Sequence, residues 1–236
     1  MIIAIDGPAG AGKSTVARII AHKLGFLYID TGAMYRALTL KIMQEKIDIK
    51  DNQRIVKMAV SSRIELTNKA DGSINVFLDG RDVSKEIREP RISQIVSDIA
   101  KIKEVREEML KLQKKLGEQN NAVLDGRDIG TVVFPEADRK FYIDARVGER
   151  VKRRYKELKE LGQDITMKDV DADLSKRDKI DSTRQYAPLK KAQDAIYIDT
   201  THMTIEEVVN RIYQKLINKK KSITLSKVTS YIRLLL

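Results

Sequence analysis

Short apolar runs recur along the chain, and most of them are separated by stretches with helical periodicity. The runs cover residues 2–5, 26–29, 122–124, 140–143 and 195–198. After the first run, Val16, Ile20 and Leu24 stand four positions apart, which places them on one face of a helix. Apolar strands that alternate with helices are typical of a parallel sheet covered on both faces. The pattern therefore predicts an α/β fold of three layers with a core five-stranded parallel sheet.

The pattern changes in the second quarter of the chain. A helix is expected near residues 52–60, and two alternating runs follow at residues 63–67 and 74–78. Asp71-Gly72 lies between these runs and favours a hairpin turn. A long charged region with helical character comes next. We interpret this part as a small α+β insertion on the α/β core.

A second polar excursion spans residues 156–184 and is expected to be helical. It has little apolar content to bury, which suits a mobile cover better than a core element. Arg177, Asp181 and Arg184 stand four and three positions apart, so all three are expected on one helix face. That face is either a solvated row of ion pairs or a set of mobile arginines that neutralise charge during phosphoryl transfer.

The chain is basic, because 45 lysines and arginines outnumber 34 acidic residues and give a net charge of +11. This balance suits a polyanionic substrate or a nucleic acid. Residues 219–236 hold five of the basic residues and no acidic one. The rest of the chain is therefore less basic than the total charge suggests, which weakens the case for a nucleic-acid-binding surface there. Four phenylalanines, eight tyrosines and no tryptophan argue against base-stacking platforms. We therefore expect no stable nucleic-acid partner.

The chain has no cysteine, which excludes disulfides, a thiolate nucleophile and cysteine-type zinc sites. His22 and His202 are the two histidines and make a poor metal set, so Mg²⁺-type or metal-free chemistry remains. Met1 leads directly into the first apolar run and then Asp6, without a basic segment or a long apolar core. We therefore expect neither a signal peptide nor a membrane span, and a cytoplasmic location.

Residues 7–14, GPAGAGKS, fit the pattern G-x-x-x-x-G-K-[ST] between an expected strand and an expected helix. There, backbone N–H groups can surround phosphate oxygens, and the helix N-terminus adds partial positive charge. Lys13 is expected to reach the β and γ phosphates, and the Ser14 hydroxyl to bind Mg²⁺. This P-loop predicts binding of a nucleoside triphosphate without identifying the acceptor. The residues assigned to ATP are Gly7, Pro8, Ala9, Gly10, Ala11, Gly12, Lys13, Ser14 and Thr15.

Two further motifs follow expected strands, so they lie at the carboxyl edge of the sheet, where open α/β folds bind ligands. DTGAMYR offers a hydroxyl, an aromatic ring and an arginine to a second anionic substrate. Alternatively, it is a helix start capped by Asp30 or Thr31. DGRD places Arg127 beside Asp128, and these either contact a ligand or form a structural ion pair.

The chain resembles the bacterial cytidylate kinase family over roughly residues 1–217. The motifs that carry the resemblance are, in order, GPAGAGKST, DTGAMYR, EIREPRIS, VREEML, LDGRDIGTVVFP and RDKIDSTRQYAPL. DTGAMYR together with DGRDIGTVVFP is far more specific than the P-loop. The resemblance implies the nucleoside monophosphate kinase fold and transfer of the γ-phosphoryl group of ATP to CMP or dCMP, with Mg²⁺ bound to ATP. We expect a monomer with no membrane partner.

The resemblance also implies roles for individual residues. Three would face the cytosine, with a fourth close by: Thr31, Arg106, Asp128 and Arg184. Three would lie near the ribose and two near the acceptor phosphate: Ser97, Arg177 and Asp181, then Arg36 and Arg127. Tyr35 completes the CMP-binding set. Position 31 is often serine in the family, so threonine keeps the hydroxyl and adds a methyl group. The catalytic residues would act by positioning and charge neutralisation without a general base: Lys13, Arg127, Arg177 and Arg184.

The same resemblance divides the chain into regions. The P-loop core would comprise residues 1–30, 118–155 and 185–217. Residues 31–117 would form the monophosphate-binding region with its insertion, and residues 156–184 a short helical lid. Residues 218–236 form a basic C-terminal tail that we expect to be peripheral to catalysis.

Other functions remain possible from the residues alone. A kinase for UMP, AMP or shikimate could share the fold, because function resides in the acceptor site. Asp128 and Arg106 favour cytosine, since a carboxylate beside a guanidinium complements its N4 amine and N3 acceptor. A GTP-binding switch protein would use Asn68-Lys69-Ala70-Asp71 as an N-K-x-D signature. Those residues lead into the expected hairpin turn instead, and no D-x-x-G element separates them from the P-loop.

Overall fold

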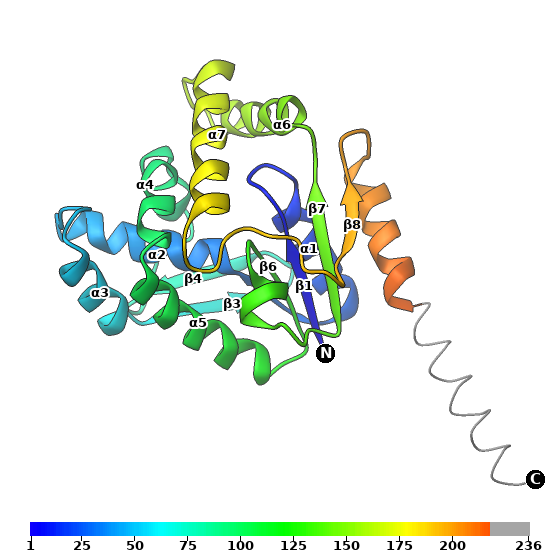
Figure 1. Cartoon of the computed structure of the whole chain (residues 1–236), viewed down its shortest axis with the longest axis horizontal. Coiled ribbons are helices and arrows are strands. Elements are labelled where there is room, and N and C mark those ends of the chain that lie inside the picture. The colour runs from blue at the N-terminus through cyan, green and yellow to red at the C-terminus, as the bar shows by residue number, and fades with distance from the viewer. Residues whose placement is uncertain (218–236) are drawn as a thin grey trace, which may run out of the picture.

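A computed structural model of the chain describes residues 1–217, and a parallel β-sheet lies at its centre (Figure 1). The strands are β1 (Ile2–Asp6), β2 (Leu27–Asp30), β6 (Ala122–Gly126), β7 (Arg139–Asp144) and β8 (Ile196–Asp199). They run parallel in the order β2-β6-β1-β7-β8. The predicted core five-stranded parallel sheet with flanking helices is therefore confirmed.

The strand that leads into the P-loop occupies the middle of the sheet. β1 pairs with β6 on one side and with β7 on the other, and its Ile3 and Ile5 are fully buried. Asp125 of β6 lies opposite Ile5 of β1 and Asp30 of β2. Because parallel strands end at the same edge of a sheet, the carboxylates of Asp6, Asp30 and Asp125 gather at the carboxyl edge, next to the P-loop.

The helix after the P-loop, α1 (Lys13–Leu24), packs on this sheet through its apolar face. Val16 and Ile20, predicted to share that face, are both buried, whereas His22 and Lys23 are exposed. Gly25 ends the helix in a left-handed conformation, which is unstrained because glycine has no Cβ to clash with the backbone. The amphipathic pattern read from the sequence thus corresponds to a real buried face.

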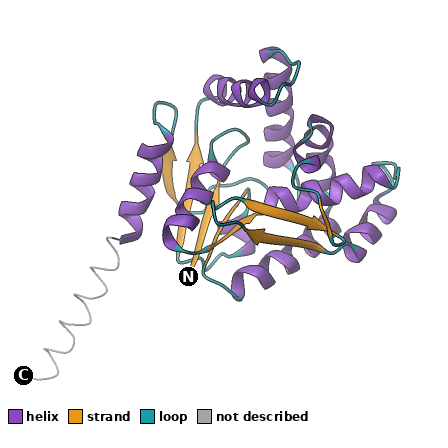
Figure 2. Ribbon diagram, turned by 180° about the vertical axis from the view of Figure 1, so that it is seen from behind, coloured by secondary structure: helices purple, strands orange, loops and turns teal. Residues whose placement is uncertain are grey.

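The predicted insertion is confirmed in outline and is richer than expected. It contains α2 (Thr31–Gln44), α3 (Asn52–Ser61), β3 (Ile64–Asn68), β4 (Ile74–Leu78), β5 (Arg81–Asp82), the 3₁₀ turn η1 (Glu86–Arg88), α4 (Pro90–Ala100) and α5 (Lys103–Glu118). β3 and β4 form the expected antiparallel hairpin, whose long strands lie side by side in Figure 2. The short strand β5 was not predicted. The expected long helical region is two helices, α4 and α5, that meet at residues 101–102.

The polar excursion forms two helices, α6 (Val147–Glu160) and α7 (Met167–Thr183), at one end of the molecule (Figure 1). They share a small apolar cluster of their own, separate from the main core: Ala9, Val151, Leu158, Val170 and Leu174. The predicted lid boundary at residue 156 falls inside the continuous helix α6. A lid that moved as one unit would therefore begin at residue 147, because an unbroken helix moves as a rigid rod.

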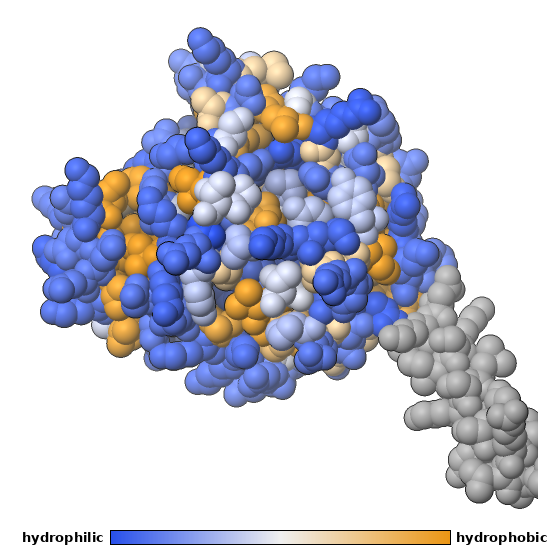
Figure 3. All heavy atoms as spheres, viewed as in Figure 1, coloured by the Kyte–Doolittle hydropathy of each residue, from blue (hydrophilic) through white to orange (hydrophobic). Residues whose placement is uncertain are grey.

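Polar side chains cover most of the face seen in Figure 3, and apolar side chains appear there only in patches. No helix within residues 1–217 is long and apolar enough to cross a membrane. The remaining regional division stays a prediction. The predicted basic tail, residues 218–236, lies outside the described residues.

The first glycine of the P-loop has a packing role that can be tested. Gly7 has φ of +148°, and a Cβ there would stand 1.9 Å from the Ile143 carbonyl oxygen of β7. Gly7→Ala is expected to lower the free energy of unfolding by roughly 3 kcal/mol, since backbone must move to relieve the clash. Urea unfolding measures this. Gly148→Ala is the control, because its Cβ would meet open space on α6; equal stability of the two variants would contradict the packing role.

Candidate active site

A cavity of about 1050 Å³ lies at the carboxyl edge of the sheet, between the P-loop and helices α2, α4, α6 and α7. Every residue predicted for the acceptor lines it: Thr31, Tyr35, Arg36, Ser97, Arg106, Arg127, Asp128, Arg177, Asp181 and Arg184. Residues 9–15 of the predicted ATP loop also line it, whereas Gly7 and Pro8 do not. Segments far apart in the sequence therefore meet around one space that is large enough for two nucleotides.

The P-loop presents its backbone to this cavity. Helix α1 begins directly after Gly12, and no side chain caps its N-terminus. Its first N–H groups are therefore available to an anion, and the helix dipole favours negative charge at the same point. The Lys13 ammonium folds back and donates to the Pro8 carbonyl oxygen at 2.6 Å. This arrangement can bind the phosphates of a nucleoside triphosphate.

The charge on Lys13 is destabilised by its surroundings. Only 5% of the residue is exposed. Burial, followed by the nearby guanidinium of Arg127, lowers the pKa of Lys13 to about 7, while Asp125 and Asp178 act in the opposite direction. An anion bound beside Lys13 would supply the missing compensation, so the site is electrostatically prepared for phosphate.

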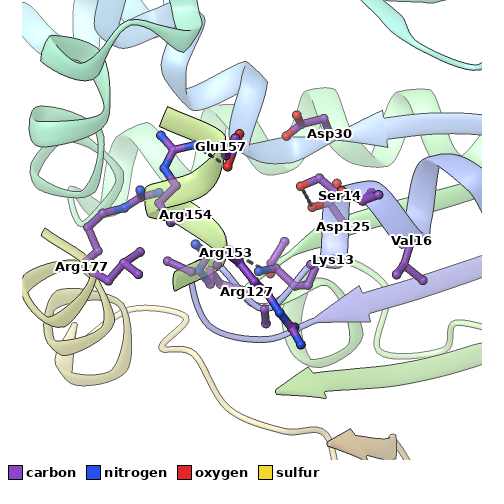
Figure 4. Close-up of a pocket in the computed structure, with 18 of the residues that line it drawn as sticks. Lys13, Ser14, Val16, Asp30, Asp125, Arg127, Arg153, Arg154, Glu157 and Arg177 are labelled. Carbon is purple, nitrogen blue, oxygen red and sulfur yellow. Dashed lines mark hydrogen bonds and ion pairs between the residues drawn. The ribbon is translucent and has the colours of Figure 1, made fainter. Parts of the chain in front are cut away.

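Asp125 is a site residue that the sequence reasoning did not assign. Its carboxylate accepts a hydrogen bond from the Ser14 hydroxyl at 2.7 Å and one from the Tyr28 hydroxyl at 2.8 Å. Burial, followed by the neighbouring carboxylate of Asp30, raises the pKa of Asp125 to about 6. Its position after a buried apolar run, at the start of DGRD, was a usable signal. Figure 4 shows Asp125 joined to Ser14 beside Lys13.

Of the two interpretations of DTGAMYR, the capped helix start is confirmed, and contact with a second anionic substrate stays a prediction. Asp30 caps α2, because its carboxylate accepts from the Ala33 N–H at 2.8 Å, and it also pairs with Arg36 at 3.0 Å. Thr31 is the first residue of α2, and its hydroxyl donates to the Asp125 carbonyl oxygen at 2.6 Å. The same turn therefore starts the helix and lines the cavity.

Asp128 forms the centre of a buried charge cluster. Its carboxylate lies 2.5 Å from Nη2 of Arg106 and 3.6 Å from Nη2 of Arg184. The Arg106 guanidinium also lies over the Tyr35 ring, 5.4 Å from its centroid. An ion pair between Asp128 and Arg127, one of the two alternatives left open, is wrong. The Asp128 carboxylate takes Arg106 and Arg184 as its partners, and Arg127 pairs elsewhere.

Arg127 pairs instead with helix α7. Its Nε donates to the Asp181 carboxylate at 2.8 Å, and Asp181 also lies 3.4 Å from Nη1 of Arg184. Burial raises the pKa of Asp181, but Arg127 and then Arg184 outweigh it and hold that pKa below its usual value. The charges of the cluster thus stabilise the ionised carboxylate.

The expectation that Arg177, Asp181 and Arg184 share one helix face is wrong for Arg184. Helix α7 ends at Thr183, and Arg184 is its extended C-cap, with φ of −60° and ψ of 142°. Its Nε donates to the Ala187 carbonyl oxygen at 2.7 Å, so the chain leaves the helix and turns back toward the cluster. The side chain still reaches Asp181, although by a different backbone route.

At this end of the cavity, the arginine side chains have more N–H donors than the surrounding protein has acceptors for them. Within residues 1–217, buried nitrogen atoms without a hydrogen-bond acceptor occur on Arg106, Arg177 and Arg184. Burial, followed by Arg127, lowers the pKa of Arg177 to about 10. Buried donors left unpaired cost free energy, and a ligand rich in acceptor oxygens would recover it. The cluster therefore matches an anionic ligand with polar edges.

A sequence model of the cytidylate kinase family matches residues 3–218 of this chain. The chain belongs to the cytidylate kinase family. A cytidylate kinase from Caldanaerobacter subterraneus subsp. tengcongensis is 55% identical over 90% of this chain and 92% of its own length. Cytidylate kinases from Clostridioides difficile and Bacillus subtilis are 49% and 48% identical, over 92% and 93% of this chain and 98% and 97% of their own lengths.

In this member of the cytidylate kinase family, helix α6 contributes two cavity-lining arginines that were not predicted from the sequence. Arg153 and Arg154 line the same cavity, and Arg153 donates to the Thr200 carbonyl oxygen at 2.6 Å. Figure 4 shows Arg154 and Arg177 on one side of the pocket and Lys13 on the other, with Arg127 and Arg153 between them. The sequence held no signal for the α6 arginines, because a charged helical stretch reads equally well as a solvated face.

The N-K-x-D match has a local structural explanation. Asn68 ends β3, and the Lys69 N–H donates to the Ser73 carbonyl oxygen at 2.7 Å across the hairpin turn. Asp71 accepts from the Ser73 hydroxyl at 2.6 Å within the same turn. None of Asn68, Lys69 and Asp71 lines the cavity. The motif therefore shapes a turn and does not favour a GTP-binding switch.

Proposed function

We propose that the protein transfers the γ-phosphoryl group of ATP to CMP and dCMP, giving CDP and dCDP. One observation carries the proposal: a single cavity joins the P-loop of Lys13 to the buried cluster around Asp128, with arginines between them. The P-loop end suits the triphosphate, and the Asp128 end suits the acceptor. Membership of the cytidylate kinase family supports the same pair of substrates.

The Asp128 cluster has the donors and acceptors that a cytosine edge requires. An ionised carboxylate can accept from the N4 amine, and a guanidinium can donate to N3. Arg106 holds the Asp128 carboxylate at 2.5 Å, and Thr31, whose hydroxyl donates to the Asp125 carbonyl oxygen, lines the same cavity. Uracil would present a carbonyl oxygen to Asp128 where the carboxylate needs a donor. Shikimate has no such edge, whereas adenine offers an amine donor and a ring-nitrogen acceptor on a larger, two-ring base. Hydrogen bonding therefore disfavours UMP and shikimate, and the assay must compare AMP with CMP.

The arginines between the two ends can stabilise the transferring phosphoryl group. Arg127, Arg177 and Arg36 all line the cavity, and Arg36 pairs with Asp30. Phosphoryl transfer proceeds mainly through positioning and charge neutralisation, which is what fixed guanidinium groups provide. The proposed reaction therefore uses Lys13, Arg127, Arg177 and Arg184 in that way and has no dedicated general base.

The residues at the P-loop also fit a Mg²⁺ ion that accompanies ATP. Mg²⁺ prefers oxygen ligands and keeps several waters, with protein groups supplying one or two contacts. The Ser14 hydroxyl and the Asp125 carboxylate, 2.7 Å apart, form such an oxygen pair beside Lys13. Ser14 would hold the ion, and Asp125 would orient the hydroxyl. When bound, the ion would neutralise phosphate charge.

A coupled assay of ADP production over a panel of acceptors tests the function directly. With ATP and Mg²⁺, CMP and dCMP are expected to give the highest kcat/KM, and UMP, AMP and shikimate much lower values. Turnover of UMP or AMP at or above that of CMP would contradict the proposal. Slow GTP hydrolysis without any response to CMP would replace the kinase with a switch protein.

The remaining parts of the proposal follow from the substrates. Both are small nucleotides, so no nucleic-acid or membrane partner is included, and the cytoplasm is the compartment that supplies them. All of the residues proposed to bind CMP line one cavity of a single chain, which supports the proposed monomer.

A further inference from the structure

Two side chains, one from α6 and one from α7, hydrogen-bond to the backbone at the tip of the P-loop. The Asp178 carboxylate of α7 accepts from the Ala9 N–H at 3.1 Å. Arg150 of α6 donates from Nη1 to the Ala9 carbonyl oxygen at 2.8 Å, and the same nitrogen hydrogen-bonds to Asp178. Both polar groups of Ala9 are therefore held by side chains outside the P-loop. We call Asp178, Arg150 and the Ala9 backbone the Ala9 clasp.

The clasp is buried and has further support. Arg150 is 5% exposed, and its Nε donates to the Ala145 carbonyl oxygen at 2.9 Å, so the guanidinium is anchored on three sides. Ala9 is 3% exposed and packs in the small apolar cluster under α6 and α7. A Cβ on Gly10 would stand 3.2 Å from the Arg150 Cβ, which shows how closely α6 approaches the loop.

The clasp differs from an ordinary surface ion pair because its side chains hydrogen-bond to the backbone of the P-loop. The next residues in the loop, Gly10, Ala11 and Gly12, have their N–H groups next to the phosphate site. The Ala9 N–H is occupied by a protein carboxylate, which defines the direction in which the next peptide groups point. The Lys13 ammonium also donates a hydrogen bond to this loop, at the Pro8 carbonyl oxygen.

The helix that carries Asp178 also serves the acceptor end. Arg177 and Asp181 project from α7 into the cavity, and Asp181 holds Arg127. We propose that Asp178 and Arg150 are positioning residues, which fix the P-loop tip relative to α7 and so align the γ-phosphoryl group with the acceptor. This inference rests on the proposed kinase function. Neither residue touches the reacting atoms; both act through the loop backbone.

Three variants of the full chain test the clasp in the ATP and CMP assay. Asp178→Ala removes the acceptor for Ala9, Asp178→Asn keeps an acceptor oxygen but loses the charge, and Asp171→Asn removes an exposed charge from the same helix as a control. We expect Asp178→Ala to lower kcat by about 10- to 100-fold with KM for both substrates within about threefold, because misplacement by about 1 Å has this effect. Asp178→Asn should retain kcat within about fivefold, and Asp171→Asn should match the wild type.

Hydrogen exchange of a peptide spanning residues 7–12 gives a readout that does not depend on the reaction. Asp178→Ala should speed exchange in this peptide at least tenfold, and the control should not. Normal kcat with faster exchange would overturn the positioning role. Equal losses in the Asn and Ala variants would assign the effect to charge and overturn it too, as would a raised KM for ATP at unchanged kcat.

Two further measurements distinguish a folding defect, or failure of the proposed function, from failure of the positioning role. Thermal unfolding identifies a variant that fails to fold, and Arg150→Lys then takes its place. It keeps the charge but cannot reach Ala9, Ala145 and Asp178 together, so kcat should fall about tenfold; wild-type kcat would overturn the proposal. If the wild type does not phosphorylate CMP, the proposed function fails, and the variants are compared with the acceptor that the panel identifies.

Discussion

Lys13→Met is expected to lower kcat by a hundredfold or more, which corresponds to roughly 3 kcal/mol of lost transition-state stabilisation. The ammonium lies in the P-loop, next to the N-terminus of α1, where the transferring phosphoryl group would gain charge in the transition state. Methionine keeps most of the aliphatic stem, so the loss reports on the charge. Steady-state kinetics at saturating ATP and CMP measure it.

The stability of the same variant should move in the opposite direction. The pKa of Lys13 is lowered to about 7, mainly by burial, so its charge destabilises the folded state at pH values below the unfolded pKa near 10.5. Replacing it should leave the melting temperature unchanged or raise it. Lys23→Met, at an exposed position on α1, is the matched control and should keep wild-type kcat. Wild-type kcat in Lys13→Met, with weaker ATP binding alone, would contradict the proposed role.

Asp128→Asn is expected to lower kcat/KM for CMP by about 30- to 1,000-fold while leaving KM for ATP nearly unchanged. Asparagine replaces one acceptor oxygen of the carboxylate with an NH₂ donor, which faces the donors of the arginines and the base. A hydrogen bond to a charged acceptor is thereby lost and a donor is left unpaired, which is worth roughly 2–4 kcal/mol. Asparagine is preferred to alanine because Asp128 lies between Arg106 and Arg184, and full removal would leave two buried guanidinium groups facing each other. Kinetics with varied CMP measure the effect.

The ratio of CMP to UMP activity decides what Asp128 does. An amide can donate to the uracil O4, so Asp128→Asn should reduce the preference for CMP over UMP. If Asp128 served only to hold Arg106 and Arg184, both acceptors would suffer alike. An unchanged ratio would therefore remove Asp128 from base recognition. Glu136→Gln, which changes an exposed carboxylate outside the cavity, is the control and should change neither acceptor.

Much of the fold could be predicted because its determinants are local. The apolar runs became the five strands, the alternating runs at residues 63–67 and 74–78 became the β3–β4 hairpin, and Asp71-Gly72 formed its turn. Periodicity and turn residues act over a few positions, so they can be read without knowing the partners. The order of the strands and the short strand β5 depend on contacts between distant segments, and spacing carries no record of those.

The site was predictable to the level of residue type and sheet edge. Strand ends followed by GPAGAGKS, DTGAMYR and DGRD had to meet at the carboxyl edge, and all three line one cavity. The local sequence pattern did not predict the ion pairs where several charged side chains compete for one partner. Arg127 is next to Asp128 in the chain but binds Asp181, which is 54 positions away, because the fold brings α7 to Arg127 while Asp128 is paired with Arg106.

By itself, the sequence determined the phosphate-binding loop, the strand and helix periodicities and the family, since each is written in contiguous residues. Only the tertiary structure decided which charges pair. It placed Asp125 under Ser14, Arg106 against Asp128, and Asp178 of α7 on the backbone of Ala9. These contacts join segments separated by 22 to 169 positions. Their physical reason is burial, because a charge removed from water must take its partner from whichever element the fold brings within reach.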